Sequence, residues 1–389
     1  MSLVNRPPLL FIVESGTDVR LVEGLSEHFD VHLLARKIEG GAEVSHQPST
    51  PYSLAVASPK RLSFAADVCR HLLRWKNKGA VLVQGYGLSA LAANLSRQFT
   101  GVPVFMLVCS PAEAYYSCRK IQTSGPSFKE LDSKLIRLLA GLNALMGGRY
   151  IVLSRYLESV VRSHGAHHVQ RIPIYGVDTT LFSPRIDSKP TLKQRLGLPA
   201  TGTLIFFSSR IAPEKDSETL LRAMHLLLSQ GHNLWLLHRS GGHKQFVASA
   251  QQHGVAHRVI ATDAVHPHRE LPLDYQACDI CVQASREEGL GFSPLEALAC
   301  ETPVVATAVG GLRETILDGE TGWSYPVGDH EALADALLDV IGNPAEAISR
   351  ARRGRQLVQQ RFEKRHVFSR LVALLNSPSS QREPVWHAK

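Results

Sequence analysis

The chain of 389 residues lacks any apolar run near the roughly 20 residues that a membrane-spanning helix needs. Its first residues lead directly into a strand-like run, and they lack the cleavage pattern of a signal peptide. We therefore expect a cytoplasmic protein, with peripheral contact to the inner face of the membrane as its only membrane option.

Cysteine is scarce, with six residues scattered along the chain. Cys278 and Cys281 form a lone C-x-x-C, and no second pair follows at zinc spacing. Because this pair sits in an apolar, strand-like run, we expect buried thiols rather than metal ligands. The sequence predicts no metal and no resident cofactor.

Several other motifs are missing. Neither half has G-x-G-x-x-G after its first strand, which disfavours a dinucleotide oxidoreductase. No G-x-S-x-G nucleophile turn is present, and no repeat period indicates a solenoid. Nucleic-acid binding has only the net charge of +8 in its favour, without a binding motif, so we expect no nucleic-acid partner.

The positive charge is concentrated in the first half. Residues 1–184 carry 20 Lys and Arg against 13 Asp and Glu, whereas the remainder carries 23 against 22. A basic first half attracts phosphates or anionic lipid. A simple solvated basic surface is an equally good interpretation.

Buried strand-like runs alternate with helical patterns along both halves, which predicts an α/β fold with two parallel, doubly wound sheets. The strand candidates are residues 9–13, 30–35, 80–87, 102–110 and 150–154, then 203–210, 233–240, 258–264, 279–285, 303–308 and 322–327. We expect domains at 1–184 and 185–360, a helix at 361–376 packing back on the first domain, and a disordered tail at 377–389. Ligands of such sheets bind beyond the carboxyl ends of the strands, so two facing edges would form a central cleft.

A long insertion between two strands of the first half carries apolar residues at helical spacing. These residues are Phe128, Leu131, Leu135, Leu138 and Leu142. Core packing is the favoured interpretation. A helix that contacts a membrane or an acceptor is the alternative.

The stretch EEGLGFSPLEALA places one carboxylate after a strand and a second in the following helix. The glycines allow close approach of the backbone to a ligand, and the free amides at a helix start favour a phosphate. Glu288 and Glu296 cannot favour a phosphate, but carboxylates accept hydrogen bonds from sugar or ribose hydroxyls. The pattern predicts a site for a nucleotide sugar.

The stretch SSRIAPEKDSETLL adds two cations at the same edge of the second sheet. Arg210 and Lys215 lie in a strand-to-helix loop, where they could bind a diphosphate and neutralise it as it leaves, without a metal. An ordinary charged surface loop is the alternative for this stretch taken alone.

Together with YGVDTTLFSP and TPVVATAVGGLRETILDGETGW, these stretches resemble the retaining glycosyltransferases of the GT-B fold, family 4 type, in order and spacing over about 200 residues. The resemblance implies two Rossmann-like domains, with the acceptor on the side of the first. It also implies hexosyl transfer with retention, by front-face attack without a protein nucleophile.

The resemblance also implies roles for individual residues. Glu288 would hold donor-sugar hydroxyls, Glu296 the ribose, and Arg210 and Lys215 the diphosphate. Further donor contacts are implied at Gly16, Gly291, Phe292, Ser293 and Leu295. The acceptor side would include Cys109, Ser110, Glu113 and Tyr175.

The first half departs from the family pattern. Cys109, Ser110 and Glu113 follow the strand where such enzymes often place a histidine, and Tyr175 precedes Gly176 where the segment usually carries Asn.

The sequence therefore predicts a transferase that uses a nucleotide sugar, such as a UDP- or GDP-sugar, in the biosynthesis of surface polysaccharide, glycolipid or a glycosylated metabolite. The acceptor is left open among lipid-linked, saccharide and small-molecule classes. Alternatives are a sucrose- or trehalose-type synthase on the same fold and a nucleotide-sugar-binding protein without catalysis.

Overall fold

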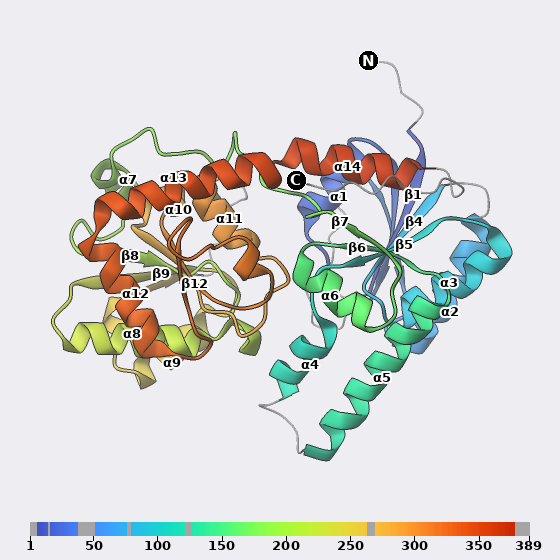
Figure 1. Cartoon of the computed structure of the whole chain (residues 1–389), viewed down its shortest axis with the longest axis horizontal. Helices are drawn as coiled ribbons and strands as arrows, with labels where there is room; N and C mark the ends of the chain where they lie inside the picture. Colours follow the sequence, from blue (N-terminus) through green and yellow to red (C-terminus); the bar gives the residue numbers. More distant parts are fainter. Residues whose placement is uncertain are drawn as a thin grey trace.

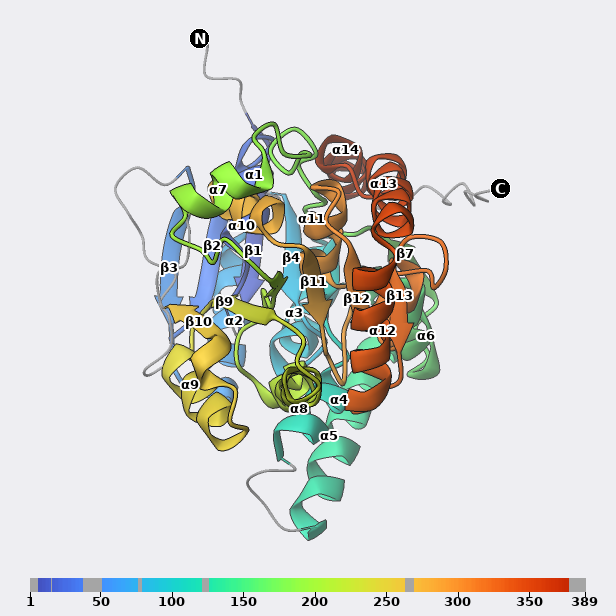
Figure 2. The same cartoon turned by 90° about the vertical axis from the view of Figure 1, so that its left-hand side faces the viewer.

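The protein forms two domains, each built on one parallel sheet (Figures 1 and 2). The computed structural model describes residues 6–14, 16–37, 51–75, 79–120, 126–262 and 269–377. The tail expected at 377–389 therefore lies outside the described residues, except for Ser377. The two sheets confirm the predicted α/β fold with two doubly wound domains.

The first sheet has seven strands in the order β3-β2-β1-β4-β5-β6-β7. Its strands are β1 (Pro8–Val13), β2 (Asp30–Arg36), β3 (Ser53–Ala57), β4 (Ala80–Gln84), β5 (Val104–Val108), β6 (Arg149–Val152) and β7 (His168–Arg171). The central strands are buried and apolar, as parallel strands covered on both faces require. The edge strands β3 and β7 were not predicted. β7 carries no apolar run, and β3 contains the short apolar run LAVA, but both strands are largely exposed.

The second sheet has six strands in the order β10-β9-β8-β11-β12-β13. Its strands are β8 (Thr203–Phe206), β9 (Leu234–Arg239), β10 (Val259–Thr262), β11 (Ile280–Gln283), β12 (Val304–Thr307) and β13 (Trp323–Tyr325). All six fall within predicted strands. Cys278 and Cys281 are buried beside or within β11, as expected for structural thiols.

Helices cover both sheets (Figure 2). In the first domain they are α1 (Val19–Ser26), α2 (Arg61–Trp75), α3 (Leu88–Thr100), α4 (Ala112–Lys120), α5 (Pro126–Leu145) and α6 (Arg155–Ser163). The second domain contains α7 (Lys189–Arg195), η1 (Pro213–Lys215), α8 (Ser217–Ser229), α9 (His243–Gln252), η2 (Ala256–Arg258), α10 (Leu271–Ala277), α11 (Phe292–Ala299), η3 (Gly310–Glu314), α12 (His330–Gly342) and α13 (Pro344–Arg361). The last helix, α14 (Lys364–Asn376), lies along the first domain (Figure 1).

The chain crosses between the domains twice, and the two crossings pair with each other. The amide of Val177 donates to Phe362 O at 2.7 Å, and the amide of Lys364 donates to Val177 O at 2.9 Å. Arg370 of α14 then donates to the carbonyl of Arg171 at 2.7 Å. Because the second crossing leads into α14, this helix packs on the first domain, while the domain boundaries themselves stay a prediction.

Helix α5 extends away from the body of the first domain in both views (Figures 1 and 2). Leu135, Leu138 and Leu142 are 52%, 58% and 37% exposed, so the expectation that they pack in the core is wrong. The buried face of this helix instead carries Ala140 and Asn143, and Asn143 bonds Asn94 at 2.8 Å. None of the described helices is both long and apolar enough to cross a bilayer.

The contact of α14 with α1 depends on a glycine. A Cβ added to Gly24 would lie 2.1 Å from Cζ of Phe368, a ring that is only 4% exposed. We therefore expect Gly24→Ala to destabilise the protein by about 1–3 kcal/mol, because the ring has to move in a packed core.

Gly141→Ala on α5 is the matched control for this prediction. Its added methyl group meets no atom within 4 Å. The same substitution there should stabilise by up to about 1 kcal/mol, through the unfolded chain. Thermal unfolding of both variants measures the difference, and equal stabilisation by both would contradict the packing of α14 on α1.

Candidate functional site

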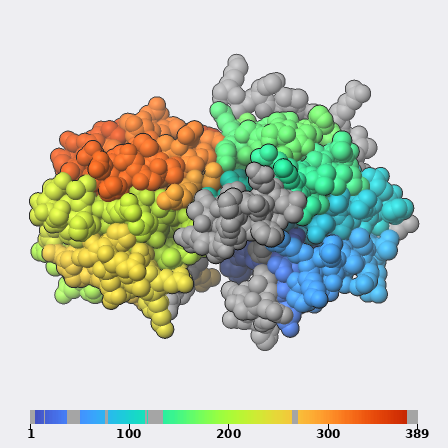
Figure 3. Space-filling view, turned by 90° about the horizontal axis from the view of Figure 1, so that it is seen from below, coloured from blue at the N-terminus to red at the C-terminus, as the bar shows by residue number. Residues whose placement is uncertain are grey.

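A cavity of about 690 Å³ lies between the domains, at the carboxyl ends of both sheets. In the first sheet the strand order reverses between β1 and β4, and the cavity is lined there by Gly16 and Gln84. In the second sheet it reverses between β8 and β11, and Arg210 and Glu288 line the cavity there. Such reversal points are where doubly wound sheets bind ligands. Figure 3 shows the two domains as separate lobes on either side of this region.

A smaller hollow of about 310 Å³ lies at the opposite end of the first sheet, where its strands begin. It is lined by Pro, Gly and apolar residues with Thr100, Asn376 and Ser377, and the described part of its lining carries no charged side chain. The interdomain cavity is therefore the candidate site.

Glu288, which lines the cavity, is paired with Lys215, and both residues are predicted donor contacts. The Nζ of Lys215 donates to Oε2 of Glu288, and both side chains are more than 85% buried. Gln283 and Ser285 donate to the same oxygen at 3.2 and 3.3 Å. The carboxylate is therefore fixed from three sides, at the point where β11 ends.

Arg210 follows β8 and is more exposed than Lys215. Its guanidinium donates to Oε1 of Glu214 at 2.7 Å, and 55% of its side chain is accessible. Glu214 itself is fully buried, and its carbonyl accepts the amide of Arg286 at 2.9 Å. Arg210 thus presents a cation to the cavity from a fixed loop.

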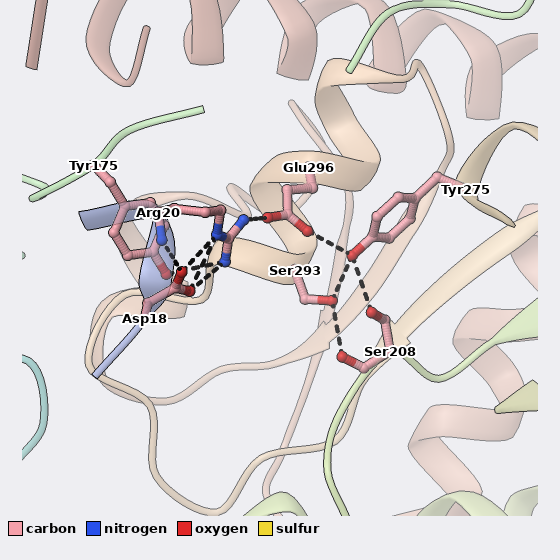
Figure 4. A network of polar contacts seen from close by, with 7 residues as sticks. All are labelled: Asp18, Arg20, Tyr175, Ser208, Tyr275, Ser293 and Glu296. Carbon is pink, nitrogen blue, oxygen red and sulfur yellow. Dashed lines mark hydrogen bonds and ion pairs between the residues drawn. The ribbon is translucent and has the colours of Figure 1, made fainter. Parts of the chain in front are cut away.

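Glu296 lies on α11 and is only 4% exposed. Its Oε2 accepts the hydroxyl of Tyr275 at 3.0 Å, and its Oε1 is ion-paired with Arg20 (Figure 4). Burial raises the pKa of Glu296, and the positive charge of Arg20 offsets only part of that effect. The predicted ribose ligand is therefore a buried carboxylate whose ionisation depends on its neighbours.

Arg20 belongs to the first domain and reaches Glu296 across the cleft (Figure 4). Its Nε and a terminal nitrogen donate to Asp18 at 2.9 and 2.6 Å. Asp18 also caps α1, where it accepts the Arg20 amide at 2.9 Å. Although burial opposes it, the Arg20 charge holds the pKa of Asp18 below its usual range.

Tyr175 packs beside this network and lines the cavity. Its ring stacks on Phe292 with centroids 4.2 Å apart, and the Arg20 guanidinium lies 4.5 Å from the ring centroid. Its hydroxyl accepts from Arg20 at 3.2 Å. Tyr175, predicted on the acceptor side, thus contacts the donor-side helix α11.

The start of α11 brings the remaining predicted donor residues together. Gly291 caps the helix with φ +89°, and Gly291 and Phe292 line the cavity. Ser293 bonds the hydroxyl of Tyr275 at 2.8 Å (Figure 4). The side chain of Leu295 is fully buried in the core, so only its backbone could face a ligand.

The first-domain candidates do not gather at one point. Cys109 lines the cavity, and burial, followed by the charge of Asp18, raises its pKa to about 12. Glu113 lies on α4 and pairs with His164 and Arg137, each at 2.8 Å, which places its carboxylate among helices of its own domain. Ser110, which follows Cys109 in the sequence, is half-buried.

Backbone contacts close the cleft on one side. The hydroxyl of Ser154 donates to Gly289 O at 2.6 Å, and a Cβ at Gly289 would lie 2.2 Å from Cys109 O, so only glycine fits there. The carboxylate of Glu314 accepts the amides of Arg155 and Tyr156 at 3.0 and 2.9 Å. A carboxylate of the second domain thereby satisfies the first amides of α6.

Sequence reasoning missed Arg20, Asp18 and Tyr275. Asp18 follows the pattern of a helix cap, which predicts the start of α1 but no interdomain contact. Arg20 and Glu296 are 276 positions apart, and no local pattern relates them.

Residues 188–357 match the model of the family glycosyl transferases group 1. The match begins just before α7 and covers most of the second domain, including both carboxylates and both cations described above.

Two curated relatives share this region. One is a GDP-mannose-dependent alpha-(1-6)-phosphatidylinositol monomannoside mannosyltransferase from Mycolicibacterium smegmatis, 32% identical over 54% of this chain and 56% of that protein. The other is a D-inositol 3-phosphate glycosyltransferase from Xylanimonas cellulosilytica, 38% identical over 48% of this chain and 45% of that protein. The chain spans about half the length of these relatives.

Similar solved structures show the fold of the whole chain. Sucrose-phosphate synthase from Thermosynechococcus elongatus has a TM-score of 0.77 at 22% identity, covering 95% of this chain and 98% of that one. Anabaena HepE in complex with UDP and glucose has a TM-score of 0.75 at 16% identity, covering 95% and 99%. The fold of the chain is GT-B.

The hydroxyl of Tyr275 is the centre of the network beneath α11. It lies within hydrogen-bond distance of Ser208, Ser293 and Glu296 and is fully buried (Figure 4). We expect Tyr275→Phe to destabilise the protein by about 1–3 kcal/mol, because buried polar partners lose a hydrogen bond.

Tyr325→Phe in the same domain is the control. Tyr325 is 2% exposed, and its hydroxyl has no hydrogen-bond partner among the described residues. Its removal should therefore leave stability unchanged or slightly higher. Denaturant unfolding compares the two variants, and an equal loss from both would contradict the network.

Proposed function

We propose that the protein is a retaining, metal-independent hexosyltransferase that moves a sugar from a nucleotide-sugar donor to an acceptor hydroxyl. The observation that carries this proposal is the placement of two cations and two carboxylates at the strand-order reversal of the second sheet. Arg210 and Glu288 line the cavity shared with the first domain. Lys215 pairs with Glu288, and Glu296 pairs with Arg20 of the first domain. The cations would bind a diphosphate, and the carboxylates would accept hydrogen bonds from hydroxyls.

The donor would lie along the start of α11. Its diphosphate would contact Arg210 and Lys215, its sugar hydroxyls Glu288, and its ribose Glu296. Lys215 and Glu288 are paired with each other at 2.5 Å, so the phosphate would take over the lysine and leave the carboxylate to accept sugar hydroxyls. Gly16 approaches the same cavity from the first domain.

In the reaction, the bond between the sugar C1 and the diphosphate oxygen breaks, and the acceptor oxygen bonds to C1 from the same face. The acceptor proton passes to the leaving phosphate oxygen. Arg210 and Lys215 neutralise the charge that develops on the diphosphate, which is the largest contribution a preorganised site supplies. The neutral thiol of Cys109 supplies no nucleophile, because its pKa is about 12.

The names of similar proteins support the donor class. One relative is named as GDP-mannose-dependent, and HepE structures contain UDP or UDP-glucose. The acceptor belongs to a lipid-linked, saccharide or small-molecule class, in polysaccharide, glycolipid or metabolite biosynthesis. The basic first half and the exposed leucines of α5 favour work at the inner face of the membrane, with the protein otherwise cytoplasmic.

The first test is a thermal shift with UDP-, GDP-, ADP- and TDP-linked sugars. A donor at a hundredfold excess over its dissociation constant should stabilise the protein by about 2.7 kcal/mol. Glu296→Gln should weaken this shift, because the ribose loses a charged acceptor. A shift without turnover on any acceptor would favour a binding protein, and no shift with any donor would refute the proposal.

The leaving-group role is tested by Lys215→Ala. Turnover should fall by about 100-fold or more, the scale of losing one preorganised charge stabiliser. Arg222→Ala is the control, since Arg222 makes only an exposed pair with Glu218 at 3.2 Å on α8. Initial rates at saturating donor measure both, and unchanged turnover in the lysine variant would rule out its role.

A further inference from the structure

Arg20 stands out among the residues around the cavity, because it is the first-domain residue that touches a carboxylate of the proposed donor site. It comes from the first turn of α1, while Glu296 is on α11 of the second domain. Nothing in the resemblance assigned it a role.

We propose that Arg20 is a positioning residue for donor binding. Anchored in the first domain, it holds the Glu296 carboxylate ionised and oriented toward the ribose of the nucleotide. This inference rests on the proposed function and adds a contribution of the first domain to recognition of the nucleoside.

The contacts of Arg20 within the first domain indicate that it is a fixed support, and not a contact that the donor displaces. Asp18 takes two of its nitrogens at 2.9 and 2.6 Å, Tyr175 accepts a further bond at 3.2 Å, and the Tyr175 ring lies under the guanidinium at 4.5 Å. Only one nitrogen is directed at Glu296 (Figure 4). Arg20 therefore keeps its position with the carboxylate as one of several partners.

The surroundings of Glu296 show why a cation is needed. Its side chain is 6% exposed. Among the described residues, the Tyr275 hydroxyl is the other polar group besides Arg20 that contacts this carboxylate. Displacing the guanidinium with neutral ribose hydroxyls would leave a buried carboxylate without a counter-charge, which is costly. Each carboxylate oxygen has two lone pairs, so ribose hydroxyls can bind while Arg20 stays.

Titratable and charged groups around Glu296 come from several elements. They are Arg20 of α1 with its cap Asp18, Tyr175 after β7, Tyr275 of α10, Cys281 of β11, Cys300 at the end of α11 and, beyond Cys300, Arg355 of α13. Burial raises the pKa of Glu296 and Arg20 opposes this rise. Removing Arg20 should therefore raise the pKa of Glu296 further. As the pH falls, the carboxylate would then become protonated at a higher pH than in wild type.

The test measures the affinity for UDP and GDP by calorimetry across pH 5 to 9 in wild type, Arg20→Met, Arg20→Lys and Glu296→Gln. We expect Arg20→Met to weaken binding by at least about tenfold near neutral pH. The pH at which the affinity of Arg20→Met falls to half should lie above that of wild type, and the affinity should recover as the pH rises. Arg20→Lys should restore much of the affinity, and the midpoint should return toward wild type.

The double variant Arg20→Met with Glu296→Gln separates an indirect role from direct contact with the donor. If Arg20 acts through Glu296, its loss adds nothing once the carboxylate is an amide. Additive losses would show that Arg20 touches the nucleotide itself and would overturn the inference.

Glu314→Gln is the matched control for loss of an interdomain contact. Glu314 joins the domains through the amides of Arg155 and Tyr156, away from Glu296. Its pH midpoint should match wild type, and a shift like that of Arg20→Met would assign the effect to domain closure and overturn the inference.

Two further outcomes are distinct. If Glu296→Gln weakens binding while Arg20→Met binds as wild type, the inference fails and the proposed function stands. If wild type binds neither probe nor any nucleotide sugar, the proposed function fails and takes the inference with it.

Discussion

The close approach of the two sheet edges is the constraint on which the site depends. Backbone groups take part in each contact: Gly289 lies against the carbonyl of Cys109, and the carboxylate of Glu314 binds the first amides of α6. Amides at a helix start and a carboxylate attract each other over a short range only. The domains must therefore meet closely, and this closeness lets Arg20 reach Glu296.

Buried carboxylates around the cleft are paired with cations. Glu296, Glu214, Asp216 and Glu288 are buried or nearly so, and they pair with Arg20, Arg210, Arg286 and Lys215, respectively. Buried charges of this kind are costly without a counter-charge. In the proposed reaction, a diphosphate that takes the lysine would release a carboxylate, and sugar hydroxyls on the same ligand could occupy it. The proposed donor carries both kinds of group.

The second domain could be predicted from sequence far better than the first. Its strands and the start of α11 follow from short motifs. The same motifs place Lys215 and Glu288 at one edge of the sheet, because these residues follow the adjacent strands β8 and β11, although their pairing was not predicted. The edge strands β3 and β7 are short and largely exposed, and α5 shows helical periodicity on a face that turned out exposed. Arg20 could not be found, since a contact 276 positions away depends on how two domains meet.

The structure gives a packing role to two first-domain residues that depart from the family pattern, Tyr175 and Cys109. Tyr175 stands where the resembling segment usually has Asn, and its ring fills the space between Phe292 and the Arg20 guanidinium. Cys109 follows the strand where a histidine is common, and its carbonyl forms the close contact with Gly289. A thiol that stays protonated at neutral pH contributes neither charge nor base there. The proposed recognition of the donor from this side of the cleft therefore rests on Arg20 and Tyr175, which contact Glu296 and Phe292 of α11.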